Sequence, residues 1–155
     1  MSSRIIQDPS WVDAILNWRW TWFAARLALT SAFLVGGLTK LSDFSAAIAE
    51  QEHFGLYPGW LWASLSILVE LGGSALMLSG YLVWLGAGGL GVLTAVAMLV
   101  ANNFWTMSGN ARLQSANAFF EHIGLIGGFV LVALVAAHRS REISPLGPTP
   151  LNTAR

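Results

Sequence analysis

The chain has 155 residues, of which 55% are hydrophobic and only 10% are charged, and eight basic and eight acidic residues give a formal net charge of zero. About a quarter of the residues in a soluble domain are charged, so this composition indicates a membrane protein of one domain. The lack of net positive charge argues against nucleic-acid binding. The absence of cysteine excludes disulfides, cysteine-ligated iron–sulfur clusters and covalently attached haem.

The N-terminal segment, residues 1–20, is predicted to lie on the membrane surface. Its stretch DPSWVDAILNWRW mixes tryptophan and aliphatic residues with charges, which is typical of an amphipathic interfacial helix. Asp8, Asp13 and Arg19 leave no compact apolar core of the kind found in a cleavable signal peptide. We therefore expect the first apolar block to be retained as a membrane span.

Four apolar blocks each approach the roughly 20 residues that cross a bilayer. The expected spans are residues 22–41, 60–80, 84–104 and 118–137. A polar loop joins the first two, in which GLYPG is a turn and SAAIAEQEHF predicts a short interfacial helix. The second and third spans form a tight hairpin, and TMSGNARLQSAN is a polar loop before the fourth.

The predicted fold is an all-α, integral membrane four-helix bundle over residues 21–138. The remaining residues, 139–155, include the proline-rich stretch SPLGPTPLNTAR and are expected to form a flexible tail. Arginines at positions 4, 19, 139, 141 and 155 flank the two ends, whereas Lys40 and Arg112 belong to the opposite side. Because basic residues favour the cytoplasmic side, both termini are predicted to be cytoplasmic.

Polar side chains recur at helical spacing within three of the spans. The three sets are Arg26, Thr30, Phe33, Gly37 and Lys40; Ser66, Glu70, Gly73, Ser74 and Met77; and Asn117, Glu121, Gly124 and Gly128. A charge at mid-span costs about 2.5–3.5 kcal/mol, so charged groups tend to face the bundle interior and to pair. We expect all three faces to point inward, with small residues allowing close helix contact.

Depth along the helices suggests which charges can meet. Lys40, Glu121 and His122 fall near the outer end of the bundle, and Glu70 falls near mid-membrane. The sequence thus predicts an outer cluster in which Lys40 pairs with Glu121 close to His122. Arg26 lies toward the other side as a structural charge that reaches Glu70 only if both side chains extend along the bundle. The alternative is that the outer pair is only an interfacial ion pair.

The quoted motifs resemble the DoxX family of small four-helix membrane proteins. The resemblance is carried by an arginine followed by FLVGGLTKL, then FGLYPGW, then LVELGGSALMLSG, over roughly residues 26–133. Arg26, Lys40, Pro58, Glu70 and Gly73 stand in the order expected for the family. The resemblance implies a prokaryotic cytoplasmic (inner) membrane and a link to redox metabolism, since relatives include a membrane subunit of thiosulfate:quinone oxidoreductase.

One function consistent with these features is a quinone-interacting subunit or anchor of a partner oxidoreductase. Quinone reduction needs an apolar slot and groups that hydrogen-bond or exchange protons at the carbonyls. The candidate catalytic residues are Glu70 and His122, and the candidate cofactor-binding residues are Lys40, Asn102, Asn103, Trp105 and Glu121. No haem, iron–sulfur cluster, structural zinc or other metal is expected, so electrons would come from a partner protein, and the chain is not expected to be an enzyme alone.

Two further functions stay open. The chain could be a non-catalytic assembly subunit of a larger membrane complex, in which its charges only fix the register of the helices. It could also be a small-molecule or proton-coupled transporter, because charged groups inside a bilayer serve such pathways. The spacing of Gly124 and Gly128 is compatible with a homodimer contact.

Overall fold

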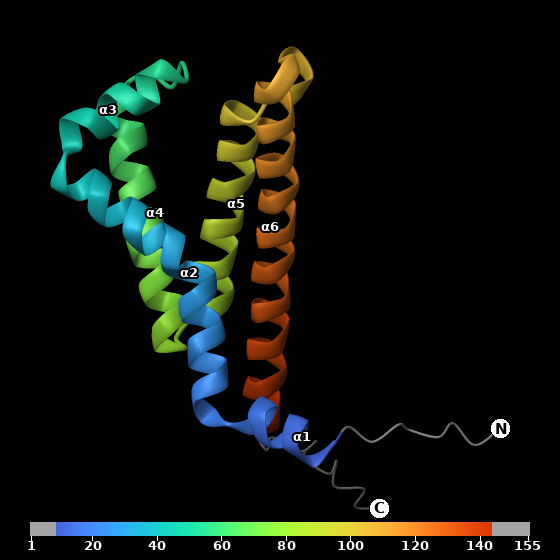
Figure 1. Cartoon of the computed structure of the whole chain (residues 1–155). Coiled ribbons are helices and arrows are strands. Elements are labelled where there is room, and N and C mark those ends of the chain that lie inside the picture. Colours follow the sequence, from blue (N-terminus) through green and yellow to red (C-terminus); the bar gives the residue numbers. More distant parts are fainter. Residues whose placement is uncertain (1–8, 144–155) are drawn as a thin grey trace, which may run out of the picture.

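The computed structural model describes residues 9–143 of the chain, with side chains up to residue 140. Its elements in order are α1 (Ser10–Asn17), α2 (Arg19–Ser42), α3 (Phe44–His53), α4 (Gly59–Ser79), α5 (Val83–Ala101), the single turn η1 (Phe104–Thr106) and α6 (Gly109–Ile143) (Figure 1). Four of these helices, α2, α4, α5 and α6, are long and apolar enough to cross a bilayer. The predicted all-α, multi-pass membrane fold is therefore confirmed.

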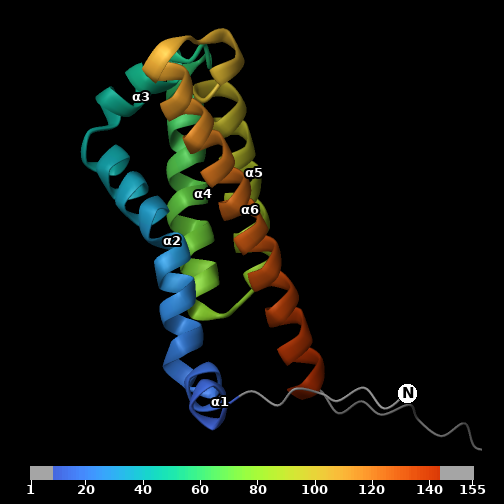
Figure 2. The same cartoon turned by 45° about the vertical axis from the view of Figure 1, so that its right-hand side comes forward.

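The four long helices run alternately up and down and pack in chain order. The main contacts join α2 with α4, α4 with α5, and α5 with α6, whereas α2 and α6 touch only slightly. The shorter helix α3 packs against the start of α4, at the end of the bundle opposite α1 (Figures 1 and 2). Helices thus form in both segments that were predicted to be short and interfacial.

Glycine residues shape the turn and the close packing of the hairpin formed by α4 and α5. Helix α4 ends at Ser79 and is followed by Gly80, whose φ of 80° is left-handed and turns the chain toward α5. Further up the hairpin, a Cβ atom on Gly86 would lie only 2.6 Å from the carbonyl oxygen of Gly73. The two backbones therefore touch directly, a contact that small residues permit between membrane helices.

The hydrophobic core lies in the half of the bundle nearest this hairpin turn. Its buried members come from the end of α4, the start of α5 and the second half of α6; they are Met77, Val83, Ala87, Leu90, Phe129 and Val132. From α2, Phe33 packs against Phe129 with tilted rings whose centroids are 5.5 Å apart. The opposite half of the bundle is less tightly packed, and it holds a cavity.

The structure corrects the predicted loop between the third and fourth spans. Most of TMSGNARLQSAN is helical, because α6 begins at Gly109 and runs for 35 residues, or about 52 Å. This stretch contains no proline and is rich in good helix formers, so only its polarity distinguished it from the span that follows. The flexible tail predicted for residues 139–155 is corrected at its start, because α6 continues to Ile143, and residues 144–155 lie outside the described residues.

Candidate functional site

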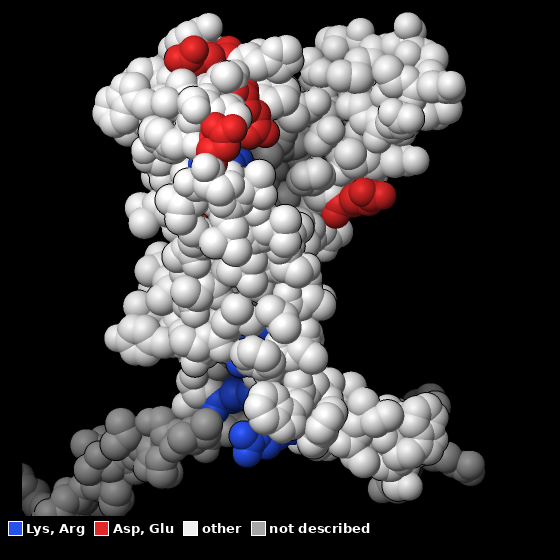
Figure 3. All heavy atoms as spheres, turned by 60° about the vertical axis from the view of Figure 1, so that its left-hand side comes forward, with Lys and Arg blue, Asp and Glu red and all other residues white. Residues whose placement is uncertain are grey.

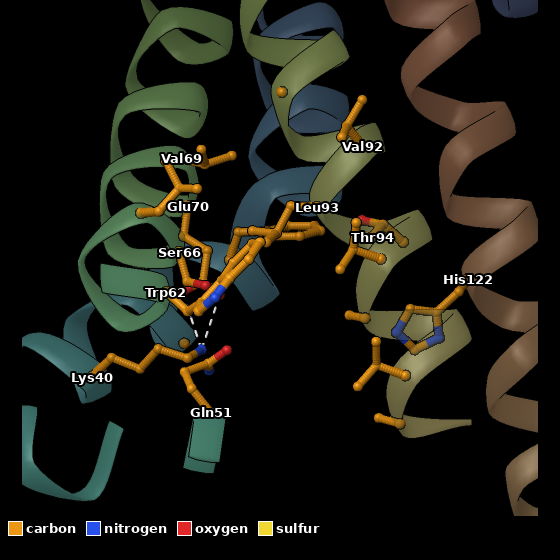
Figure 4. A pocket seen from close by; sticks show the side chains of 18 of the residues that line it. Lys40, Gln51, Trp62, Ser66, Val69, Glu70, Val92, Leu93, Thr94 and His122 are labelled. Atoms are coloured by element: carbon orange, nitrogen blue, oxygen red, sulfur yellow. Dashed lines mark hydrogen bonds and ion pairs between the residues drawn. The ribbon is translucent and has the colours of Figure 1, made fainter. Parts of the chain in front are cut away.

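A cavity of about 610 Å³ lies between α2, α4, α5 and α6, in the half of the bundle that α3 covers (Figure 4). Most of its wall is apolar. The polar side chains that reach it, together with Trp62 of α4, come from five helices: Lys40 of α2, Gln51 of α3, Ser66 and Glu70 of α4, Thr94 of α5 and His122 of α6. The cavity thus has the size and the lining expected of a site for a small, largely apolar molecule.

An ion pair between neighbouring helices forms one wall of this cavity. Lys40 Nζ lies 2.9 Å from Glu70 Oε1 and donates a second, longer hydrogen bond of 3.3 Å to Oε2. Gly36 lies close by, and a Cβ atom there would be 3.4 Å from Glu70 Oε2. The two side chains are 18% and 10% exposed, so the pair is mostly shielded yet reachable from the cavity.

The opposite side of the cavity carries His122 (Figure 4). Its Nδ1 lies within hydrogen-bond distance of the Ala118 carbonyl oxygen on the same helix. A carbonyl oxygen only accepts, so Nδ1 carries a proton and the neutral ring has Nε2 as an acceptor. The site therefore presents an ammonium–carboxylate pair on one wall and an imidazole on the other.

Helix α3 covers the outer end of the cavity because two local features hold it in place. The Asp43 carboxylate accepts hydrogen bonds from the Ala46 amide and the Ser45 hydroxyl, each 3.0 Å long, and caps the first turn of α3. These bonds lower the pKa of the Asp43 carboxyl. At the start of α4, a Cβ atom on Gly59 would lie 2.8 Å from the Ile48 carbonyl oxygen, so glycine allows α3 to pack closely.

The predicted pairing of Lys40 with Glu121 is wrong, because Lys40 pairs with Glu70. Helix α2 packs against α4 and hardly touches α6, so Lys40 is beside α4. Helix α6 is also rotated so that His122 faces the cavity while Glu121, about 100° away, is exposed. The loosely expected pair of Arg26 with Glu70 does not form either, because Arg26 donates to the Met77 carbonyl oxygen.

The inward faces predicted for α2 and α4 are confirmed, whereas the face predicted for α6 is wrong except at Gly128, which packs against Leu29. On α6, Asn117, Glu121 and Gly124 are exposed, and the buried residues lie on other faces. Asn102, Asn103 and Trp105 do not line the cavity. They lie in the connection from α5 to α6, where Trp105 makes edge-to-face contacts with Phe104 and Phe119, with ring centroids 5.4 and 6.0 Å apart.

Sequence reasoning missed several residues of this site, among them Gln51, Trp62 and Thr94. A signal existed for Thr94, which is the one polar side chain in the apolar helix α5 and is almost completely buried. Its hydroxyl donates to the Leu90 carbonyl oxygen, 2.7 Å away. Gln51 carried no such signal, because its role depends on how α3 folds over the bundle. Among the described residues, no three His, Asp or Glu side chains are grouped so as to hold a metal ion.

The DoxX family model matches residues 21–103, which is slightly more than half of the chain. The chain belongs to the DoxX family. The match covers α2 to α5 and so includes both partners of the Lys40–Glu70 ion pair, whereas α6, with His122, lies beyond it. No curated protein and no solved structure matches this DoxX protein.

Proposed function

We propose that this DoxX protein is a quinone-interacting membrane subunit that serves a partner oxidoreductase in a prokaryotic cytoplasmic membrane. The observation that supports the proposal most directly is the 610 Å³ apolar cavity with the Lys40–Glu70 ion pair in its wall. Pockets of roughly 300–1,000 Å³ take up organic molecules of drug size. The cavity is therefore large enough for a quinone ring and the beginning of an isoprenoid tail.

The polar groups of the cavity fit the two carbonyl oxygens of a quinone. The Lys40 ammonium has three N–H donors, of which two contact Glu70, so it can also donate to a ligand carbonyl. On the other side of the cavity, His122 can donate through Nε2 when the ring is protonated. Trp62 offers an aromatic face for stacking. Apolar side chains such as Leu93 and Val96 exclude water around the ring.

Reduction of a quinone adds electrons and protons to its carbonyl oxygens. We assign the electron supply to a partner protein and the exchange of protons to Glu70 and His122. Glu70 is suited to this because it is hydrogen-bonded to Lys40, so a proton can be held at either end of the pair. The chain then acts as the membrane component of an enzyme and not as the whole enzyme.

Equilibrium binding of a short-tailed quinone to the purified chain in lipid nanodiscs tests this proposal. Glu70→Gln should weaken binding about tenfold, since it removes the charged partner that orients Lys40. Glu121→Gln is the matched control, because this carboxylate is exposed and does not line the cavity. Undetectable quinone binding to the unmodified chain, or equal losses in both variants, would contradict the proposal.

A role in assembly is the second candidate, and one observation favours it. Glu121 lies on an exposed face of the membrane-spanning helix α6, where contact with lipid is costly for a charge. A neighbouring protein that covers this face would remove that cost. Purification from the native membrane in mild detergent should then recover a stoichiometric partner that Glu121→Ala releases and Glu70→Gln retains. Equal recovery with both variants would contradict this role.

A further inference from the structure

A second cavity, of about 420 Å³, lies at the opposite end of the bundle from the quinone cavity. It forms where α2 begins, where α4 turns into α5 and where α6 approaches its end. The residues that matter are Trp22, Arg26, Gly80, Trp84, Arg139 and Ser140. Figure 3 shows Lys and Arg side chains near this end, whereas most Asp and Glu side chains visible in that view lie toward the other end.

Arg26 is the buried member of this group, with only 7% of its surface exposed. Its Nη1 donates to the carbonyl oxygen of Met77 in the last turn of α4, where the helix dipole favours a cation. Its Nε is buried and has no hydrogen-bond partner among the described residues. A buried donor without an acceptor is costly, and Arg26, which lines the cavity, has no described carboxylate partner to neutralise its charge.

Arg139 brings a second positive charge to the same cavity. The guanidinium carbons of Arg26 and Arg139 lie 5.2 and 5.1 Å from the centroid of the Trp22 ring, so they are within about 10 Å of each other. Like charges this close repel, and among the described side chains no carboxylate forms an ion pair with either one. An anion bound in this cavity would offset the repulsion between them.

The small residue in the wall of the cavity leaves room for Arg26. A Cβ atom on Gly80 would lie 3.3 Å from Arg26 Nη1, so a side chain there would crowd the guanidinium. Trp22 and Trp84 line the cavity at the ends of their helices, and tryptophan at such positions is typical of the level of lipid headgroups. The cavity is therefore at the depth where phosphate groups of a bilayer are found.

We propose that the cavity between Arg26 and Arg139 binds a phosphate ester anion, supplied by the headgroup of an anionic phospholipid. Guanidinium groups bind phosphate with paired, charge-assisted hydrogen bonds, and two of them suit a headgroup that carries net negative charge. Inorganic phosphate presents the same oxygens and is the soluble alternative source. The site is independent of the quinone cavity and of the function proposed for it.

The test compares lipid binding and phosphate binding in three forms of the full chain. Arg139→Gln removes the exposed member of the pair, and because this side chain is exposed the variant is expected to fold. Arg19→Gln is the matched control: its guanidinium also stacks on a tryptophan, 4.9 Å from the Trp20 centroid, but it does not line the cavity. Native mass spectrometry follows titration of the delipidated protein with phosphatidylglycerol or phosphatidylcholine.

We expect the unmodified chain to bind phosphatidylglycerol about tenfold more tightly than phosphatidylcholine, and Arg139→Gln but not Arg19→Gln to abolish this preference. A separate melting series with sodium phosphate against sodium chloride at equal ionic strength identifies the soluble source. A further outcome is that phosphate raises the melting temperature of the unmodified chain and not of Arg139→Gln, while neither phospholipid is preferred. That result would support the anion site but assign soluble phosphate, and not a lipid headgroup, as its ligand. Neither effect, or equal effects of the two arginine substitutions, would overturn the proposal.

Discussion

Lys40 and Glu70 form a shielded ion pair between neighbouring helices. The stability of a protein suffers more when one member of such a pair is removed than when both are replaced. Removing one charge should lower the free energy of unfolding by about 3 kcal/mol, because the other charge stays buried without a partner. Replacing both by apolar residues of similar size is often nearly neutral. We therefore expect Lys40→Met and Glu70→Met to be destabilising singly, and the double variant to recover most of the loss.

A double-mutant cycle of thermal unfolding in detergent measures this coupling. The same double variant distinguishes a structural role of the ion pair from a role in binding. It should fold well and still fail to bind quinone. Additive losses in the double variant would mean that the two side chains are not coupled. Quinone binding in a stable double variant would mean that the ion pair is not part of the site.

At the scale of elements, the α4–α5 hairpin depends on the contact between Gly73 and Gly86. Gly86→Ala places a methyl group 2.6 Å from a backbone oxygen, so the helices must move apart at a cost of about 1–3 kcal/mol. Gly72→Ala is the control, because nothing lies within 4 Å of a Cβ atom there. Melting temperatures in detergent should fall for Gly86→Ala and stay level or rise for Gly72→Ala. A similar change in both would contradict the close contact.

Helix α3 should loosen in acid because its cap is a carboxylate. The pKa of Asp43 is lowered by the Ala46 amide and the Ser45 hydroxyl, so the ionised form stabilises the folded helix. This contribution is complete above the unfolded pKa of about 4 and is lost as the pH falls through the lower, folded value. Hydrogen exchange in α3, corrected for the intrinsic pH effect, should therefore quicken in the unmodified chain below pH of about 4.

Asp43→Asn gives the control for this acid effect. Asparagine caps helices about as well as aspartate but does not titrate, and Glu50 and Glu52 of α3 remain in both proteins. The variant should keep the protection of α3 at neutral pH and lose the additional quickening in acid. Identical pH profiles in the two proteins would show that Asp43 is not responsible.

The elements were largely predictable from the sequence, but the rotation of α6 was not. Periodicity correctly placed Arg26 and Thr30 of α2, and Ser66 and Glu70 of α4, on buried faces. Periodicity failed on α6, because apolar residues occur on every face of that helix. Its few polar residues did not indicate which face meets α5. The Lys40–Glu70 pair was missed for a related reason: depth along a helix says nothing of which helices are neighbours.

At the scale of the whole molecule, an even number of candidate spans, four, predicts that both termini lie on one side of the membrane. The positive charge near the termini predicts that this side is cytoplasmic. The natural chain has no cysteine, so single-cysteine variants can be labelled without background. In intact cells, a membrane-impermeant maleimide should label Ser108→Cys, which precedes α6, and should not label Asn152→Cys until the cells are opened. The reverse pattern would invert the orientation.

The two cavities give the molecule different chemistry at its two ends. At one end, an apolar cavity is lined by the Lys40–Glu70 ion pair and the imidazole of His122. At the other end, a cavity is lined by the guanidinium groups of Arg26 and Arg139, which have no described carboxylate partner. Between them lies the packed core of α4, α5 and α6. Substitutions at one end are therefore expected to leave binding at the other end unchanged, because sites without shared partners act independently.

The proposal that quinone occupies the cavity between α2, α4, α5 and α6 is tested most directly by photoaffinity labelling. The purified chain in nanodiscs is irradiated with an azidoquinone, digested, and mapped by mass spectrometry. We predict that label is found on residues that line this cavity, such as Trp62 or Leu93, and that unlabelled quinone in excess suppresses it. Label spread over lipid-facing residues, with no protection by excess quinone, would contradict a quinone site in this protein.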